Sequence, residues 1–338
     1  MKKVSLLLLL CLVTTISKAQ DIDALLAAGK EDAQRFANNY LEPATNGLMY
    51  SMNANWFNTA HSKPLLGFEI SIVTNASAVK NENKTFLMDT NQYNNIQFVQ
   101  GGNAQQVSTA LGNNNNSRFV EIQYKVPNTN TILKEQVELP VGLLDKNINL
   151  LPTAFIQGSL GLVKGIEIKA RFLPKINTDD ISLSMYGAAV QFEITKWLPA
   201  NKLLPIAISG LVAYTCLDGS YDLTDASGFS GENQRVKNET NTVLLQLIAS
   251  TKLPIINFYA GLGYIKGKSD SDVLGTYKST NARIIPFSET DPFSVSSKVA
   301  SVRGTVGARL KLGFFRLNAE YHLSEFDTYS VGLSFGIR

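Results

Sequence analysis

Charged side chains recur at every second position in several segments of this chain. Glu167, Lys169 and Arg171 form one such row. Successive residues of a β-strand point to opposite faces, so charges two positions apart share one face. Such rows can set the ion selectivity of a pore. They can equally brace neighbouring strands and keep an interior hydrated. The charged candidates are Glu167, Lys169, Arg171, Lys252, Arg303, Arg309, Lys311, Arg316 and Glu320.

The sequence gives little support for a serine-hydrolase site or a metal site. A serine hydrolase needs a base within hydrogen-bond reach of its nucleophile, and His322 has only Ser324, Ser330 and Ser334 near it in sequence. A nucleophile elbow, which is a turn from a strand into a helix, is not predicted there. Zinc needs three or four Cys, His or carboxylate ligands at characteristic spacings, and none are seen. We expect neither an enzyme nor a metal or other cofactor.

Residues 1–19 have the organisation of a secretory signal peptide. Lys2 and Lys3 precede an apolar run, Leu6 to Val13, and Ser17-Lys18-Ala19 provides a small-residue cleavage site. No later segment has the roughly 18 unbroken apolar residues of a helical membrane span. The sequence therefore predicts export, with any membrane attachment made through strands.

Net charge argues against nucleic acid as a partner. The chain has 31 Lys and Arg residues and 28 Asp and Glu residues. Cleavage would remove Lys2, Lys3 and Lys18 and no acid, which leaves 28 of each sign. Nucleic-acid binding depends on concentrated basic charge, and a neutral mature chain does not supply it.

The last 37 residues alternate apolar and polar side chains through three successive segments. In the last of these, Tyr329, Val331, Leu333, Phe335 and Ile337 share one parity. Each segment is about as long as the 9–11 residues that a tilted strand needs to cross a bilayer. An apolar face toward lipid and a polar face toward a lumen are typical of a transmembrane β-barrel. The prediction is an all-β, antiparallel outer-membrane barrel over residues 65–338.

Similar patterns along the chain give about 12 candidate spans, with room for two more, and such barrels have even strand numbers. The predicted ring therefore has 12–14 strands, two of them at Phe119–Val126 and Ile132–Leu139. Because the C-terminus of such a barrel normally lies in the periplasm, counting back makes Asp218–Thr240 and Gly267–Val299 long external loops.

Residues 20–64 differ from the rest, because apolar residues such as Leu25, Leu26 and Phe36 recur at helical spacing. Glu42-Pro43-Ala44 should end this helix, and a second helical piece over Thr45–Ala60 contains Trp56 and Phe57. The two pieces could fill the lumen as a hatch, or they could sit outside on the periplasmic rim. Alternation also leaves apolar residues on the lumen side, including Leu244, Ile248 and Tyr259, and these suit a hydrophobic solute or the packing of the helices.

The sequence resembles FadL-like outer-membrane proteins, in particular an uncharacterised branch from Bacteroidota. The resemblance is carried by the signal peptide ending Ala19-Gln20, by Glu42-Pro43-Ala44, by Trp56-Phe57, and by strand blocks such as Phe258-Tyr259-Ala260-Gly261-Leu262-Gly263-Tyr264. It implies an N-terminal hatch that closes the lumen. The family carries an Asn-Pro-Ala motif near the hatch, and here Glu42 replaces the asparagine.

The combined prediction is an outer-membrane channel that admits hydrophobic or amphipathic small molecules past a plug. Its expected partners are outer-membrane lipid and such a solute. Two alternatives remain open. One is a general diffusion porin, and the other is a barrel without transport that serves a secretion or envelope partner protein.

Overall fold

The computed structural model describes residues 28–112, 117–125, 131–142, 149–178, 180–199, 204–222, 230–278 and 288–337. The predicted signal peptide and cleavage site, and Leu25 and Leu26 of the predicted first helix, lie outside these residues. None of the described helices is long and apolar enough to cross a membrane.

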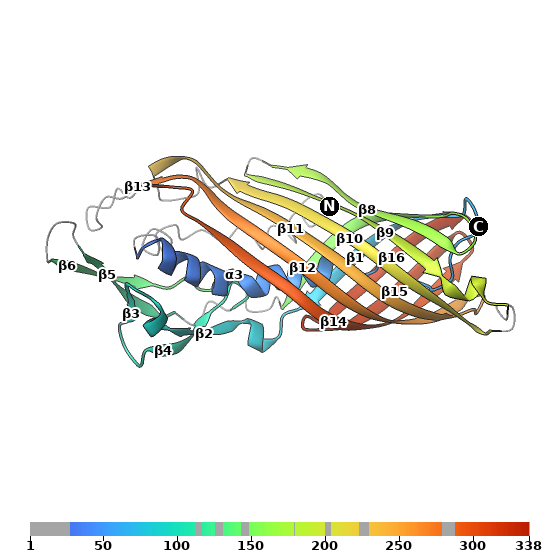
Figure 1. Cartoon of the computed structure of the whole chain (residues 1–338), viewed down its shortest axis with the longest axis horizontal. Helices are drawn as coiled ribbons and strands as arrows, with labels where there is room; N and C mark the ends of the chain where they lie inside the picture. Colours follow the sequence, from blue (N-terminus) through green and yellow to red (C-terminus); the bar gives the residue numbers. More distant parts are fainter. Residues whose placement is uncertain are drawn as a thin grey trace.

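Ten of the described strands close into one antiparallel ring (Figure 1). Around the ring the order is β1, β7, β8, β9, β10, β11, β12, β14, β15 and β16, and β16 pairs with β1 to close it. Their bounds are β1 Phe68–Ala78, β7 Leu150–Gly161, β8 Ile166–Asn177, β9 Ile181–Glu193, β10 Ile206–Asp222, β11 Ser230–Thr251, β12 Ile256–Lys278, β14 Phe293–Leu312, β15 Phe315–Leu323 and β16 Thr328–Ile337.

The predicted barrel class is confirmed, but the predicted count of 12–14 strands is wrong. The two surplus strands are β5 (Phe119–Lys125) and β6 (Ile132–Glu138), which form a separate sheet with β3 (Ile96–Phe98) in the order β3-β5-β6. A further small sheet joins β2 (Thr85–Asp89) to β4 (Ala104–Ser108). Alternation shows that a segment is a strand, but it does not show which sheet the strand joins.

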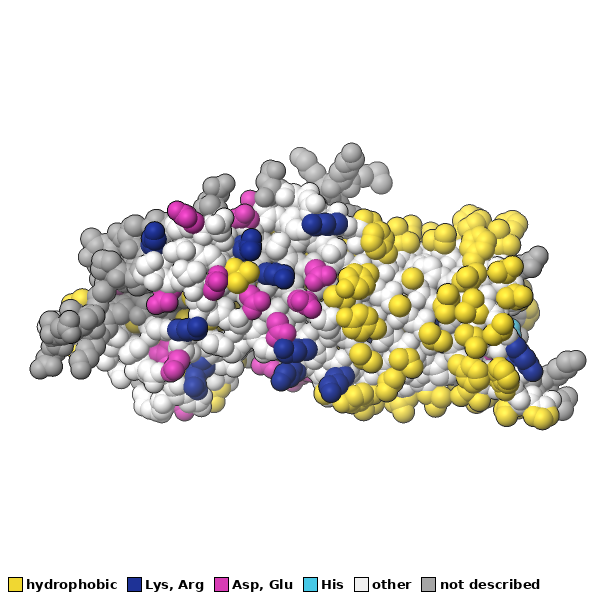
Figure 2. Space-filling view, turned by 45° about the horizontal axis from the view of Figure 1, so that its top comes forward, with side chains coloured by type: hydrophobic (Ala, Val, Ile, Leu, Met, Phe, Trp, Pro, Cys, Tyr) yellow, Lys and Arg dark blue, Asp and Glu magenta, His cyan; other side chains and the backbone are white. Residues whose placement is uncertain are grey.

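The outer face of the ring is apolar over one half of its length (Figure 2). In β16, Tyr329, Val331, Leu333, Phe335 and Ile337 are all exposed, and the residues between them are buried. The predicted parity of β14, β15 and β16 is therefore confirmed. Aromatic side chains pair on this surface, as Tyr321 with Tyr329 and Phe192 with Trp197, which is typical of the interfacial girdles of membrane barrels.

Four strands continue well past the apolar band. β10, β11, β12 and β14 are 17, 22, 23 and 20 residues long, about twice the span that a bilayer requires. Figure 2 shows Lys, Arg, Asp and Glu over this extension. The expected long loops 218–240 and 267–299 are thus mostly paired strand, with the short strand β13 (Ser288–Thr290) beside β12. We call this the extended end of the barrel, and the other end the short-turn end.

The N-terminal helix α3 (Lys30–Met52) starts at the extended end and runs toward the ring (Figure 1). The prediction that Glu42-Pro43-Ala44 ends the helix is wrong, because Pro43 lies inside it. The Thr45 hydroxyl donates to the carbonyls of Leu41 and Glu42, and Ala44 is buried. Packing along the whole helix outweighs the local cost of a proline. The second predicted helical piece is likewise absent beyond Met52, where irregular chain leads to β1.

The segment between β1 and β7 forms a small body around the first half of α3. We call its described residues, 79–112, 117–125, 131–142 and 149, the β1–β7 insert. The Asp32 carboxylate accepts from the backbone N–H groups of Asn94 and Asn95 at 2.7–3.1 Å. Tyr40 donates its hydroxyl hydrogen to the Val141 carbonyl at 2.8 Å. Short 3₁₀ helices complete the described elements: Asn81–Asn83, Thr90–Gln92 and, between β9 and β10, Ile194–Trp197.

Candidate functional site: a filled lumen

Residues 51–63, which we call the lumen segment, pass through the ring and are surrounded by its inward faces. Side chains or backbone of β1, β7, β8, β9, β10, β11, β14 and β16 hydrogen-bond to it. β12 contributes Tyr259, whose ring packs edge-on against Phe57 with centroids 5.5 Å apart. The exposed fractions of Trp56 and Phe57 are 0% and 1%. The chain therefore occupies its own lumen.

Arg171 holds the middle of the lumen segment. Its guanidinium donates to the backbone carbonyls of Met52 and Ala54 and to the Gln157 side chain. The same group lies 3.5 Å from the centroid of the Trp56 ring, a cation–π distance. A Cβ added at Gly187 would lie 3.1 Å from Trp56 Cζ2, so a glycine on β9 makes room for this stack. Arg171 thus acts as a brace against the wall.

Two buried carboxylates fasten the last residues of the segment near the short-turn end. Glu167 accepts from Lys63 N at 2.9 Å and Lys63 Nζ at 3.0 Å, and Lys169 Nζ lies 3.2 Å away. Glu193 accepts from Ser62 N at 2.7 Å and lies 3.1 Å from His61 Nδ1. Buried charges require such partners, because isolated they cost several kcal/mol.

A third buried carboxylate, Glu69 on β1, forms ion pairs with arginines of two other wall strands, β14 and β15. Arg309 and Arg316 lie 3.1 and 3.0 Å from its Oε2, and Asn58 of the lumen segment donates to Oε1 at 2.9 Å. Arg309 also donates to Asn58 Oδ1 at 3.0 Å. These ion pairs brace the wall and the segment together, which is the structural alternative considered for the charged rows.

The predicted lining residues fall into three groups. Leu244, Ile248 and Tyr259 are buried and face inward. Of the charged set, Glu167, Lys169, Arg171, Arg303, Arg309, Arg316 and Glu320 also face inward. Lys252 and Lys311 do not belong with them: Lys252 begins the connection after β11, and Lys311 is exposed near the end of β14.

The predicted hatch residues separate in space. Trp56 and Phe57 lie in the lumen segment, whereas Glu42, Pro43 and Ala44 lie mid-way along α3, with Glu42 exposed.

The residues that sequence reasoning missed are the polar ones of the lumen segment, notably Asn53, Asn55 and Asn58, together with Glu69 and Glu193. The sequence feature that could have identified them is an Asn-, Thr- and Ser-rich stretch next to two large aromatic residues. The predicted helix over Thr45–Ala60 covers this stretch and is wrong beyond Met52.

The serines around His322 hydrogen-bond to groups other than its ring. His322 Nδ1 lies 2.8 Å from Thr305 Oγ1, and Ser334 Oγ lies 2.8 Å from Ser71 Oγ. The Gly-x-Ser-x-Gly spacing of a serine-hydrolase nucleophile elbow occurs at Gly332, Ser334 and Gly336. These residues lie inside β16, however, and not at a turn from a strand into a helix. Among the described residues, no group of three or more His, Cys, Asp and Glu could hold a metal ion.

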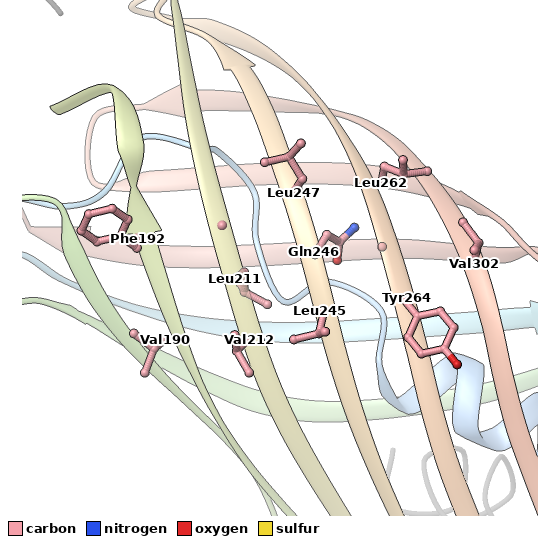
Figure 3. Close-up of a pocket in the computed structure, with 12 residues that line it drawn as sticks. Val190, Phe192, Leu211, Val212, Leu245, Gln246, Leu247, Leu262, Tyr264 and Val302 are labelled. Carbon is pink, nitrogen blue, oxygen red and sulfur yellow. The ribbon is translucent and has the colours of Figure 1, made fainter. Parts of the chain in front are cut away.

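A shallow apolar hollow of about 620 Å³ lies on the outer face of β9 to β14 (Figure 3). Gly210 and Gly263 contribute no side chain there, while Val212, Leu247 and Leu262 are exposed around them. The hollow belongs to the lipid-facing band, so acyl chains would fill it. We assign it no separate role.

A closed antiparallel ring with an apolar outer band and a buried polar interior is the architecture of an outer-membrane β-barrel. Within that class, the chain belongs to the family of unknown function DUF6588, whose profile matches residues 1–337. No curated protein matches the chain.

Several solved barrels share weak similarity with the chain. Ail of Yersinia pestis is 10% identical, with 81% of this chain and 100% of that chain covered and a TM-score of 0.26. The β domain of the Bordetella autotransporter BrkA is 10% identical (80% and 100% covered, TM-score 0.35). The protease OmpT of Escherichia coli is 8% identical (82% and 100% covered, TM-score 0.32). Such values say nothing about the activity of this chain.

Proposed function

We propose that this protein is a non-conducting outer-membrane barrel that carries the β1–β7 insert outside the cell, as a binding platform for an envelope or secreted protein. The observation that carries the proposal is the lumen segment, which eight wall strands hydrogen-bond and a ninth packs against. No catalysed reaction is part of the proposal.

The width of the barrel supports the absence of a pore. Barrel diameter grows with strand number, and eight strands enclose little more than their own side chains. Ten strands add only modest space, and the lumen segment with Trp56 and Phe57 occupies it. The carboxylates Glu167 and Glu193 also fix the segment near the short-turn end, so displacing it would break several buried charge pairs.

The platform role is supported by the surface of the β1–β7 insert. It places large apolar side chains in solvent away from the lipid band, with Leu87 exposed by 62% and Ile132 by 55%. Phe119 on β5 and Leu133 on β6 are also exposed. Large apolar side chains exposed on a small body are typical of protein–protein contact sites.

Conductance and co-purification together test this proposal. The intact protein in planar bilayers should show no stable channel, and it should retain a stoichiometric partner after cross-linking in cells. Replacing residues 80–148 by a short turn should abolish partner retention and leave a folded barrel, because Val79 N already donates to Asn149 O at 2.8 Å. The lumen variant Phe57→Ala should keep the partner. A large steady conductance of the intact protein would identify a porin and refute the proposal.

A second candidate is uptake of hydrophobic or amphipathic small molecules, as the FadL-like resemblance implies. The supporting observation is the apolar set around Phe57, formed by Tyr259, Leu244 and Ile248. Deleting residues 20–60 should then raise the single-channel conductance, and mass spectrometry should find acyl chains retained after gentle detergent extraction. Unchanged conductance and an extract free of acyl chains would remove this candidate.

A further inference from the structure

The inward face of β15 carries a continuous row of buried polar groups. Its four inward side chains, Arg316, Asn318, Glu320 and His322, have exposed fractions of 1–5%. Each contains a polar atom without a hydrogen-bond partner among the described residues. These atoms are Arg316 Nε and Nη1, Asn318 Oδ1, both carboxylate oxygens of Glu320, and His322 Nε2.

Three of these side chains make other contacts, which limit their rotation toward new partners. His322 Nδ1 lies 2.8 Å from Thr305 Oγ1, and Arg316 Nη1 lies 3.0 Å from Glu69 Oε2. The Asn318 amide donates to the Tyr259 hydroxyl at 3.5 Å. Glu320 Oε2 lies 3.5 Å from His322 Nε2, a contact without hydrogen-bond geometry.

The lumen segment does not reach this row. Every other strand of the ring bonds to residues 51–63 or packs a ring against them, but among the described residues no hydrogen bond, ion pair or ring contact joins β15 to that segment. On the adjacent β14, Arg303 Nε and Arg309 Nε are also without hydrogen-bond partners, although both guanidinium groups bond to the segment by other atoms. Arg171 Nε on β8 and Gln191 Oε1 on β9 also have no hydrogen-bond partner among the described residues, but both side chains bond to the lumen segment by other atoms. β15 differs because none of its inward side chains bonds to that segment.

The chemistry of the row selects its ligand. A buried polar group without a partner costs roughly 1–3 kcal/mol, and native proteins satisfy such groups with buried water. The row mixes a donor at Arg316 with acceptors at Asn318 and Glu320. A cation would meet the guanidinium and an anion would meet the carboxylate, whereas water both donates and accepts.

The spacing of the row fits hydrogen-bonded water. Inward positions on one strand are about 7 Å apart, and two hydrogen bonds of roughly 2.8 Å in series nearly cover that distance. We propose that the inward face of β15 binds a row of water molecules between the wall and the lumen segment. The row is a path for water that bypasses the lumen segment.

Phe326 closes this path at the extended end. It lies in the loop just past His322, its exposed fraction is 0%, and its ring centroid lies 5.9 Å from that of Tyr50 on α3. The Tyr50 hydroxyl donates to Glu325 Oε2 at 3.2 Å, which fastens the loop to the helix. The row of water is therefore closed at this end, in line with the proposed absence of conduction.

X-ray hydroxyl-radical footprinting of the full chain in detergent micelles tests the bound water directly. The two histidines make a matched pair, because the His61 side chain is 56% exposed and the His322 side chain is 1% exposed. Water next to His322 should make its oxidation approach that of His61, while fully buried Met52 stays protected. Protection of His322 equal to that of Met52 would overturn the proposal.

Stopped-flow osmotic shrinkage of proteoliposomes tests the closure. Phe326→Ala should raise water permeability several-fold over the wild-type protein, and the double variant Phe326→Ala/Asn318→Leu should lose that gain. The control is Phe155→Ala, which removes another buried inward ring, on β7, and should leave permeability at the wild-type level. No rise with Phe326→Ala, or an equal rise with Phe155→Ala, would refute the path. Unheated gel migration confirms that each variant is folded.

Discussion

The inward faces of β8 and β15 carry the same kinds of side chain and differ in what stands opposite them. On β8, Glu167 bonds to Lys63 and Arg171 bonds to two carbonyls of the lumen segment. On β15, the carboxylate of Glu320 and the amide oxygen of Asn318 have no hydrogen-bond partner among the described residues. A polar side chain that faces the lumen therefore acts as a brace where the lumen segment bonds to it, and as a proposed water ligand where that segment does not.

This difference predicts that polar-to-apolar substitutions are costly where the lumen segment is bonded and nearly neutral at Asn318 on β15. The free energy of unfolding by urea in lipid vesicles is the suitable measurement. Trp56 and Trp197 are the only tryptophans of the chain, so their fluorescence reports the lumen and the outer surface.

Arg171→Met should have the largest effect. It removes two hydrogen bonds to the lumen segment, one to Gln157, and the stack on Trp56. The substitution leaves three buried oxygen acceptors without this donor, at roughly 1–3 kcal/mol each, and we expect a loss of about 4 kcal/mol. Arg235→Met, at an exposed position of β11, is the control and should change stability by less than about 0.5 kcal/mol. Equal effects of the two variants would show that Arg171 is not a brace.

Gln191→Leu should cost less, about 2 kcal/mol. Its amide donates to the Thr59 carbonyl at 3.0 Å, and the residue is fully buried. The leucine fills similar volume but leaves that carbonyl without a donor. Urea unfolding checks the value, and an unchanged midpoint would mean that the Thr59 carbonyl has another donor available.

Ser250→Ala should cost about 1 kcal/mol. The hydroxyl lies 3.1 Å from Thr59 Oγ1 and accepts from Ala60 N at 2.9 Å. A double-mutant cycle with Thr59→Val isolates the contact, because the two losses should be less than additive. Fully additive losses would assign both effects to other interactions.

Asn318→Leu should have the smallest effect, within about 0.5 kcal/mol, because its one protein hydrogen bond is long, at 3.5 Å to the Tyr259 hydroxyl, and apolar packing otherwise replaces a water contact. It is matched to Gln191→Leu, since both replace a buried amide that faces inward, with exposed fractions of 1% and 0%. Urea unfolding of both variants under the same conditions compares β9, which bonds to the lumen segment, with β15, which does not. A loss as large as that of Gln191→Leu would mean that β15 also contributes direct bonds to the protein interior.

The side chains that face outward from the barrel could be predicted from the sequence, because they follow a local alternating pattern. The alternation in Val302–Arg338 gave the parity of β14, β15 and β16, since lipid selects apolar side chains at every second position. The same reasoning predicted that Arg171, Arg303 and Glu320 face inward. The partners of Arg303 could not be predicted, because Gln246 and Asn53 lie 57 and 250 positions away from it.

Three features were decided only by the tertiary structure. β5 and β6 alternate like wall strands, yet they pair with each other, and β5 with β3, in a sheet outside the ring. Pro43 should end a helix by local rules, yet packing against the β1–β7 insert and β14 keeps α3 continuous. The Asn-rich stretch after Met52 has no local signature of its own, and it takes its path from hydrogen bonds to eight strands.

The sequence by itself therefore determined that strands form, which face of each meets lipid, and that charges lie within. Ring closure, strand count and the division of inward charges between braces and proposed water ligands required the folded molecule. The physical reason is that side-chain alternation is repeated every two residues along the chain, whereas the partner of a buried polar group is set by chain segments brought together only on folding.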